Sequence, residues 1–354
     1  MARTPSALAA LALIVPASCA APDAPVAPLT RAVWRDSVRL VDSDSFPIQT
    51  PSGLTRLADG RFVVADFGAK QLRIFDAGGR ALRSIGRRGR GPGEFVAPSA
   101  LDVLGAEEIV VLDVGTQRVS VVDVQGGTVG RSARLLGQGL DLRVAHGVVH
   151  VAIPSALHNR AFATWDMVAD TTVARGVMPA LYDAYPRLRR NLGLSVLASG
   201  RDGLWVGLLG SNSVALHPRE AVDAPVRTVE LPRRVRRGVP VDRPEWLQRE
   251  MAYEEELQSV SVLTALAELR DGRIAAVHQD ITLGAQSASS VAYLTILDPA
   301  SGAGCIDLLL PLRAEEMPVL RFIDDRLYAA RVMPDGDDVA TWVHSLDVAA
   351  LPCR

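Results

Sequence analysis

Short apolar runs separated by turns rich in Gly and Asp recur along most of the chain. Residues 51–79 align without gaps onto residues 98–126, at an offset of 47, with matching Pro, Ser, Leu, Asp and Gly positions. Each copy contains runs such as FVVAD and QLRIFD, which are rich in β-branched and aromatic residues. This composition and punctuation favour strands over helices.

The turn followed by an apolar strand recurs in weaker form to the end of the chain. The six turns begin at residues 59, 106, 146, 202, 271 and 324. Four-stranded propeller blades span about 40–50 residues, and the two longest intervals between turns contain insertions. The pattern therefore predicts an all-β fold, one six-bladed β-propeller over residues 32–354, with short helical insertions over one face.

The glycine-rich stretch IGRRGRGPGEF, residues 85–95, falls between the first two predicted blades. It lacks the Lys-Ser/Thr ending of a phosphate-binding loop and does not open a helix, so we interpret it as a structural turn. The longer stretch GRGPGEFVAPSALDV resembles the junction of NHL-type repeats. The resemblance fades from the third blade onward, and it implies the same propeller fold.

Two insertions and one leftover strand complete the predicted architecture. Residues 183–194 precede the fourth blade, and residues 242–260 precede the fifth, with a helix start at Asp242. Both lie in connections between blades, so we expect them to cap one mouth of the channel. Residues 32–42 form a strand before the first blade, which is expected to add to the last blade as its outer strand and hide an edge.

The N-terminus is typical of an export signal. Residues 1–19 contain an early Arg3 and an apolar stretch over residues 8–15, far shorter than a membrane-spanning helix. PASC, ending at Cys19, resembles the lipobox of bacterial lipoproteins, which implies lipidation of that cysteine; ordinary signal-peptide cleavage nearby is the alternative. Residues 20–31 are expected to be a flexible tether. We therefore expect an exported, cell-envelope protein that contacts membrane only through a lipid anchor.

The remaining cysteines, Cys305 and Cys353, are expected to form a disulfide outside the cytoplasm, with two separate thiols as the alternative. The formal net charge of −2 gives no reason to expect a nucleic-acid partner. We expect a monomer.

Loops joining the second and third strands of each blade supply the candidate binding residues. They share one face with the between-blade connections, and they carry Asp66, Lys70, Asp113, Gln117, His158, Asn159, Asn212 and Asp280, followed by Asp335, Asp337 and Asp338. Carboxylates and amides that converge on the axis could hold a calcium ion, but such residues in loops are commonly solvated turns.

Two further groups of residues allow a functional and a structural interpretation. Arg87, Arg88 and Arg90 are expected on the same face as the arginines of residues 233–237, where they could attract an anionic partner or remain solvated. His146 and His150 are four residues apart and could form a zinc pair, although His146 occupies a turn position.

The sequence contains no Gly-x-Ser-x-Gly elbow and no recognisable Cys–His or paired-acid catalytic set. The function that we predict is therefore a non-enzymatic propeller, with no cofactor, that binds a protein, peptide or glycan on its loop face. The alternative is a metal-dependent propeller enzyme of the lactonase or lyase type, with its site at the channel mouth. Propellers serve both classes, so fold alone does not choose between them.

Overall fold

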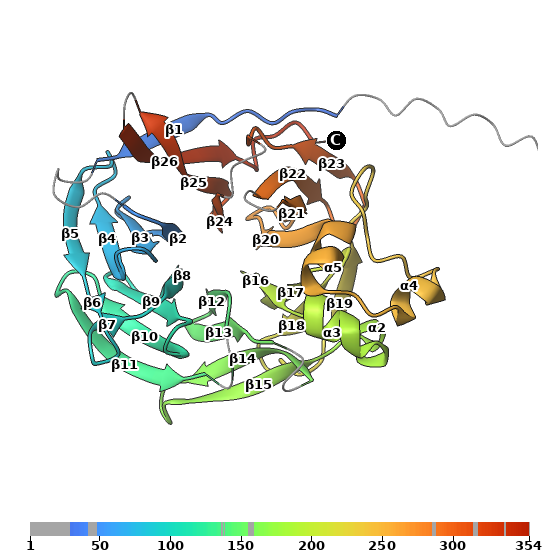
Figure 1. Cartoon of the computed structure of the whole chain (residues 1–354), viewed down its shortest axis with the longest axis horizontal. Coiled ribbons are helices and arrows are strands. Elements are labelled where there is room, and N and C mark those ends of the chain that lie inside the picture. Colours follow the sequence, from blue (N-terminus) through green and yellow to red (C-terminus); the bar gives the residue numbers. More distant parts are fainter. Residues whose placement is uncertain are drawn as a thin grey trace, which may run out of the picture.

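The computed structural model is a ring of six four-stranded antiparallel sheets (Figure 1). It describes residues 29–41, 48–135, 137, 139–154, 159–284, 288–313, 318–335 and 338–353. From its inner to its outer strand, the first blade consists of β2 (Pro51–Arg56), β3 (Phe62–Asp66), β4 (Gln71–Phe75) and β5 (Ala81–Ile85). The second consists of β8 (Pro98–Val103), β9 (Glu108–Asp113), β10 (Arg118–Asp123) and β11 (Thr128–Arg134). The third consists of β12 (Leu142–Ala145), β13 (Val148–Ala152), β14 (Arg160–Asp166) and β15 (Thr171–Val177). The fourth blade consists of β16 (Ser195–Ser199), β17 (Gly203–Leu208), β18 (Ser213–Pro218) and β19 (Arg227–Glu230). The fifth consists of β20 (Val262–Glu268), β21 (Ile274–Leu283), β22 (Ala288–Leu297) and β23 (Gly304–Leu309). The sixth consists of β24 (Val319–Ile323), β25 (Arg326–Asp335), β26 (Asp338–Asp347) and β1 (Asp36–Leu40). The predicted six-bladed propeller is confirmed.

The two ends of the chain close the ring together. Strand β1 pairs antiparallel with β26 as the outermost strand of the sixth blade, which confirms the predicted closure. The segment before β1 also reaches the fifth blade, because the Ala32 amide donates to the Leu309 carbonyl at 2.9 Å. On that same outer strand, β23, Cys305 forms a disulfide with Cys353, with the two Cα atoms 4.9 Å apart. The N-terminal segment and the C-terminal tail are therefore both fastened to the fifth blade.

The core lies between neighbouring blades, where the faces of adjacent sheets pack together. One cluster joins Val63 and Ile74 of the first blade to Leu101 and Ile109 of the second. All five residues of β3 are buried, since a central strand is covered on both faces. This explains why the strands show continuous apolar runs rather than alternation.

Three inner strands carry a bulge at the same place, and the bulged residue has a hydroxyl group in each case. That hydroxyl lies 3.1–3.3 Å from a carbonyl of the second strand, in the pairs Ser52–Ala65, Ser99–Leu112 and Thr264–Val277. This contact satisfies a buried carbonyl that the bulge removes from the ladder. The Ser52 hydroxyl also lies 2.7 Å from the Pro98 carbonyl of the second blade. Beside one bulge, a Cβ added to Gly53 would lie 2.4 Å from the Ser99 carbonyl oxygen, so only glycine fits between these two blades.

The glycine-rich stretch forms a tight turn between the first and second blades. Its two-residue strands β6 (Arg87–Arg88) and β7 (Glu94–Phe95) run parallel. The Glu94 carboxylate accepts the Gly91 amide and the Arg87 guanidinium, both at 2.9 Å. Gly86 has a φ of +83°, and a Cβ there would lie 2.4 Å from the Phe95 ring. The turn therefore requires glycine for its local geometry.

The insertions form four short helices, α2 (Ala180–Ala184), α3 (Pro186–Leu192), α4 (Pro244–Gln248) and α5 (Tyr253–Ser259). The expectation of a helix starting at Asp242 is corrected, because α4 begins at Pro244 and the chain is extended before α5. Leu247, Met251 and Leu257 are all buried. Their spacing does not place them on one helical stripe, so the chain must turn to bury all three.

The two insertions pack against each other through charged groups. The buried Arg187 of α3 lies 3.6 Å from the Glu256 carboxylate of α5 and stacks over the Trp246 ring of α4 at 4.4 Å. Asn191 donates to the same carboxylate at 2.6 Å. Within the described residues, no helix has the length and apolar character needed to span a membrane.

Candidate functional site

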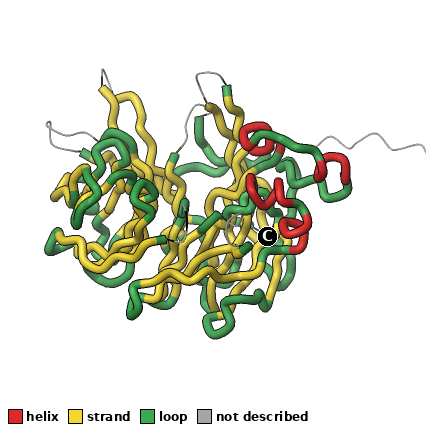
Figure 2. The backbone as a smooth tube through the Cα atoms, turned by 60° about the horizontal axis from the view of Figure 1, so that its bottom comes forward, coloured by secondary structure: helices red, strands yellow, loops and turns green. Residues whose placement is uncertain are grey.

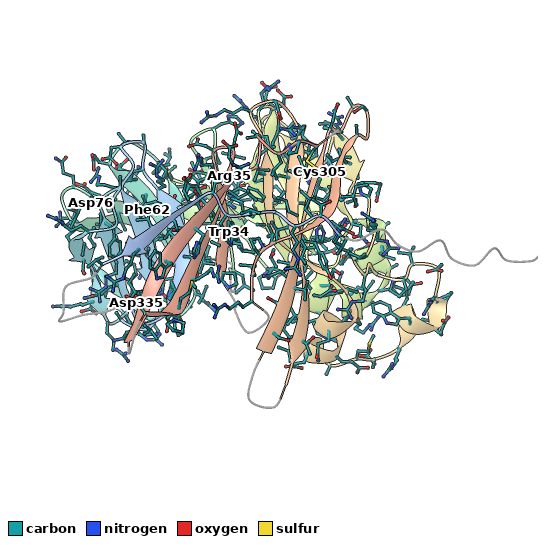
Figure 3. All side chains as sticks on the ribbon, turned by 90° about the horizontal axis from the view of Figure 1, so that it is seen from above. Trp34, Arg35, Phe62, Asp76, Cys305 and Asp335 are labelled. Carbon is teal, nitrogen blue, oxygen red and sulfur yellow. A yellow bond between two sulfur atoms is a disulfide. The ribbon has the colours of Figure 1, made fainter. Side chains whose placement is uncertain are left out.

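One face of the ring gathers the between-blade connections and the loops that join second and third strands; we call it the loop face. Strands β21, β22, β25 and β26 are ten residues long, against four to seven in the other blade strands, and their hairpins extend on this side. The hairpin residue Asp335 and the helical insertions lie on the same side of the ring (Figure 3), and strand pairs rise beyond the sheets beside the helices (Figure 2). The insertions therefore flank the channel mouth.

The channel opens on the loop face as a cavity of about 280 Å³. Residues from the inner strands of all six blades, or from the segments that lead into them, line it. Leu140 is exposed at this mouth, and four further apolar lining residues are half-buried: Leu194, Leu209, Val319 and Leu320. The mouth is therefore an apolar cup in contact with solvent.

The loop face around this cup also carries exposed apolar side chains. They come from a second-to-third strand loop, the two long hairpins and the second insertion, and they are Phe67, Val241, Tyr253, Val291, Val332 and Val339. Single exposed apolar residues are ordinary, but exposed apolar residues on several elements of the face that holds a concave apolar mouth favour an interaction site.

Arg321 of β24 closes the cup from below. From the sixth blade it crosses to the third, where Nη1 donates to Asp141 at 2.9 Å, and to the second, where Nη2 donates to the Leu101 carbonyl at 2.8 Å. Nη2 also lies 3.3 Å from Asp102. Burial raises the pKa of Asp102, and the Arg321 charge opposes that rise. One guanidinium thus ties three blades together across the axis.

A lower chamber of about 440 Å³ lies on the other side of this bridge. Asp141 lines the upper cup, whereas Asp102 lines the lower chamber, so the Arg321 bridge lies between the two. The charged residues of the lower chamber are engaged with the protein: Arg143 donates to the Leu197 carbonyl at 2.8 Å, and Glu268 accepts the Trp205 indole N–H at 2.6 Å.

The predicted residues of the first two blades support the loops themselves. Asp66 is fully buried and accepts the backbone amides of residues 49, 50, 68 and 69 at 3.0–3.1 Å. Asp113 repeats this arrangement with the amides of residues 96, 97, 115 and 116 at 2.8–3.1 Å. Lys70 and Gln117 hold the matching left-handed turn positions, with φ of 61° and 55°. The Lys70 ammonium lies 3.6 Å from the centre of the Phe67 ring.

The other predicted loop residues are spread around the face and do not converge. Asn159 accepts a bond from Arg189 at 2.9 Å, and Asn212 accepts one from Arg236 at 3.4 Å. Asp280 accepts the Ser261 hydroxyl and, at 3.3 Å, the Tyr293 hydroxyl. Asp335 pairs with Arg39. His158 and Asp337 lie outside the described residues.

Of the arginines that were predicted to share the loop face, some lie on the surface and one lies in the core. Arg87, Arg88 and Arg90 are exposed, and Arg87 pairs with Glu94. Placing Arg236 on the face was wrong, because its guanidinium is fully buried against the equally buried Asp307. Burial lowers the pKa of Arg236, and Asp307 counters this. Asp307 also accepts the Arg234 and Val235 amides at 2.6 and 2.8 Å, which fixes the loop leading to the second insertion.

The proposed zinc pair is not formed. His146 lies in a turn with a φ of 52° and bonds the Gly200 carbonyl through Nε2 at 2.8 Å, whereas His150 lies within β13 and contacts Thr164 at 3.1 Å. In the part of the chain that the structure describes, no three His, Cys, Asp or Glu residues are grouped so that they could hold a metal ion.

Sequence reasoning missed Arg321, Asp102 and Asp141. The available signal was a lone arginine inside the apolar strand VLRFI, because a buried charge requires a partner. No residue pattern near that strand identifies its partners, which lie about 180 and 220 residues earlier in the chain.

Comparisons with known proteins agree with this architecture. A family of six-bladed beta-propellers, DUF5128, matches residues 37–135. A DUF4221 family member from Bacteroides vulgatus has a TM-score of 0.60 at 9% identity, with 90% of this chain and 98% of that chain covered. A Bacteroides fragilis protein described as exported has a TM-score of 0.54 at 12% identity, with 88% and 94% covered.

Virginiamycin B lyase from Staphylococcus aureus has a TM-score of 0.51 at 11% identity, with 87% of this chain and 98% of that chain covered. No curated protein matches the chain. At these identities the structural likeness extends to the fold alone. The chain is a six-bladed β-propeller similar to these proteins.

Proposed function

We propose that this protein is a non-enzymatic, envelope-associated propeller that binds a protein or peptide partner on its loop face. The observation that carries the proposal is the apolar cup of about 280 Å³, set among the exposed apolar side chains of the loop face. A partner that inserts an apolar side chain into the cup would bury it against half-buried leucines, and the surrounding residues would exclude water, as at known interaction hot spots.

The charged groups at the floor of the cup and on the loop face favour this role over catalysis. Arg321 is engaged by Asp141 and by two backbone carbonyls, so it acts as a fixed floor. Asp280 is occupied by Ser261 and Tyr293. The metal-dependent alternative has no candidate centre within the described residues, and no specific observation favours it.

Site-specific photocrosslinking in cells tests the proposal. A photoreactive residue at Leu140 should give a discrete adduct with a partner that mass spectrometry identifies as protein or peptide. Val168 is the matched control, because it is also an exposed apolar residue but lies in the third-to-fourth strand turn of the third blade, on the opposite face.

A Leu140→Glu variant that folds normally should lose the partner, since it would place a charge at the apolar mouth. Absence of any adduct at Leu140, or an equal adduct at Val168, would contradict the assignment of the loop face.

A further inference from the structure

A separate cavity lies between the third and fourth blades, at the end of the sheets opposite the loop face. Its volume is about 310 Å³, and it is lined by both blades. Three of the six histidines of the chain belong to it, His146 and His150 from the third blade and His217 from the fourth. None of the roles discussed above uses this cleft.

Each of these histidines has one ring nitrogen engaged by the protein. Nδ1 of His217 lies 2.8 Å from the Val222 carbonyl, and Nε2 of His146 lies 2.8 Å from the Gly200 carbonyl. A carbonyl only accepts, so these nitrogens carry protons, and in a neutral imidazole the opposite nitrogen bears a lone pair. Nδ1 of His150 contacts the Thr164 hydroxyl, which can either donate or accept. No described residue hydrogen-bonds the second ring nitrogen of any of the three.

The inner imidazoles are fixed in place across the blade interface. His150 and His217 each meet the Phe162 ring edge to face, with ring centroids 5.6 and 5.3 Å apart. Both are buried, so their orientation is set before any ligand arrives, which lowers the entropy cost of binding.

The buried end of the cleft offers neutral hydrogen-bonding groups. Burial lowers the pKa of His150 to about 4 and lowers that of His217 as well, so both imidazoles are uncharged near pH 7. Arg175 pairs with Asp223 at 3.1 Å, and Arg219 donates to the Arg201 carbonyl at 2.6 Å. Arg175 therefore has a carboxylate partner, whereas Arg219 and Glu220 bring one charge of each sign to the exposed rim of the cleft.

We propose that this inter-blade cleft binds a small neutral molecule with several hydroxyl or amide N–H donors, of the monosaccharide class. Its hydroxyl groups donate to the lone pairs of His217 and His146, and the Thr164–His150 pair adapts as donor or acceptor. Leu204 and Val222 supply apolar wall for the C–H face of such a ring. This site is independent of the loop face.

Saturation-transfer NMR of the exported chain with D-glucose, D-galactose and N-acetyl-D-glucosamine tests the proposal. At least one sugar should bind saturably, with a dissociation constant on the order of millimolar. His217→Phe keeps an aromatic ring against Phe162 but removes both nitrogens, and it should weaken binding by at least about tenfold. Tyr253→Phe, which removes a polar atom on the loop face, is the matched control and should leave the affinity unchanged.

Saturable binding that survives His217→Phe would overturn the proposal, as would the absence of saturable binding for all three sugars. Zinc binding that depends on His217, without sugar binding, would replace the proposal with a metal site. If His217→Phe fails to fold, His146→Asn serves instead, because Asn tolerates the left-handed turn while losing the imidazole lone pair; it should also weaken sugar binding, and an unchanged affinity would count against the site.

Discussion

Arg321 and Asp141, separated by 180 residues, meet across the channel axis at 2.9 Å and join the sixth blade to the third. The same guanidinium reaches the Leu101 and Leu142 carbonyls, so that it holds blades on opposite parts of the ring. The channel is consequently divided into an apolar cup and a charged lower chamber, rather than open from face to face.

Arg321→Met should lower the free energy of unfolding by about 3 kcal/mol, because it leaves the two carboxylates without their cation in a poorly solvated place. Chemical denaturation of the mature chain measures this. Arg326→Met is the control: Arg326 pairs at 2.7 Å with Asp36, but both side chains are substantially exposed, so its loss should cost at most about 1 kcal/mol.

Adding Asp102→Asn to Arg321→Met should recover part of the lost stability, because it removes one of the two uncompensated charges. If the two arginine variants are equally stable, the bridge does not hold the ring together, and its position across the axis is incidental.

Removal of residues 32–42 should destabilise the whole propeller and lower the thermal midpoint in calorimetry. The deletion strips β1 from β26 and exposes the edge of the sixth blade. It also removes the Ala32 bond to Leu309 of the fifth blade. A chain that lacks only residues 20–28 is the control and should melt like the full mature chain. Equal melting of both truncated chains would refute the closure role of β1.

Cys353→Ser should lower the unfolding free energy by up to about 4 kcal/mol, because the Cys305–Cys353 bond closes a loop of 48 residues in the unfolded chain. The same loss should appear when the wild-type protein is reduced. Reduction should have no further effect on the variant, which separates the disulfide from general thiol effects. Two free thiols in the exported wild-type protein would contradict the pairing.

Cys19→Ala should move the protein from the membrane fraction to the soluble exported fraction, since lipid anchoring needs the sulfur of that residue. Ser18→Ala is the neighbouring control and should stay with the membrane. If the wild-type protein is itself soluble after export, simple secretion replaces the lipoprotein interpretation. Cys19 lies outside the described residues, so this prediction rests on the sequence.

Features that depend on residues close together along the chain were predictable from the sequence. The offset of 47 between the first two repeats placed Asp66 and Asp113 at equivalent turns, where each organises the amides of its own loop and of the segment before the inner strand. The glycine-rich turn followed from its local requirement for positive φ and close packing.

The binding candidates show the limit of the same reasoning. Loop position placed the candidate loops on one face of the ring. It could not show that the Asp66 carboxylate accepts backbone amides or that Arg236 points into the core toward Asp307. The direction and burial of a side chain depend on the residues that the next blade places beside it. A single sequence does not specify how neighbouring blades pack.

The sequence by itself determined the strand pattern, the number of blades and the closing strand, because these follow from repeated local preferences and from the need to cover a sheet edge. Only the tertiary structure decided what lies on the axis and between the blades. Arg321 meets Asp141 and Asp102, and His150 and His217 both contact Phe162, because the packing of blades around the ring brings together residues from different blades. The energy of such contacts depends on distance and burial in space, which separation along the chain does not reveal.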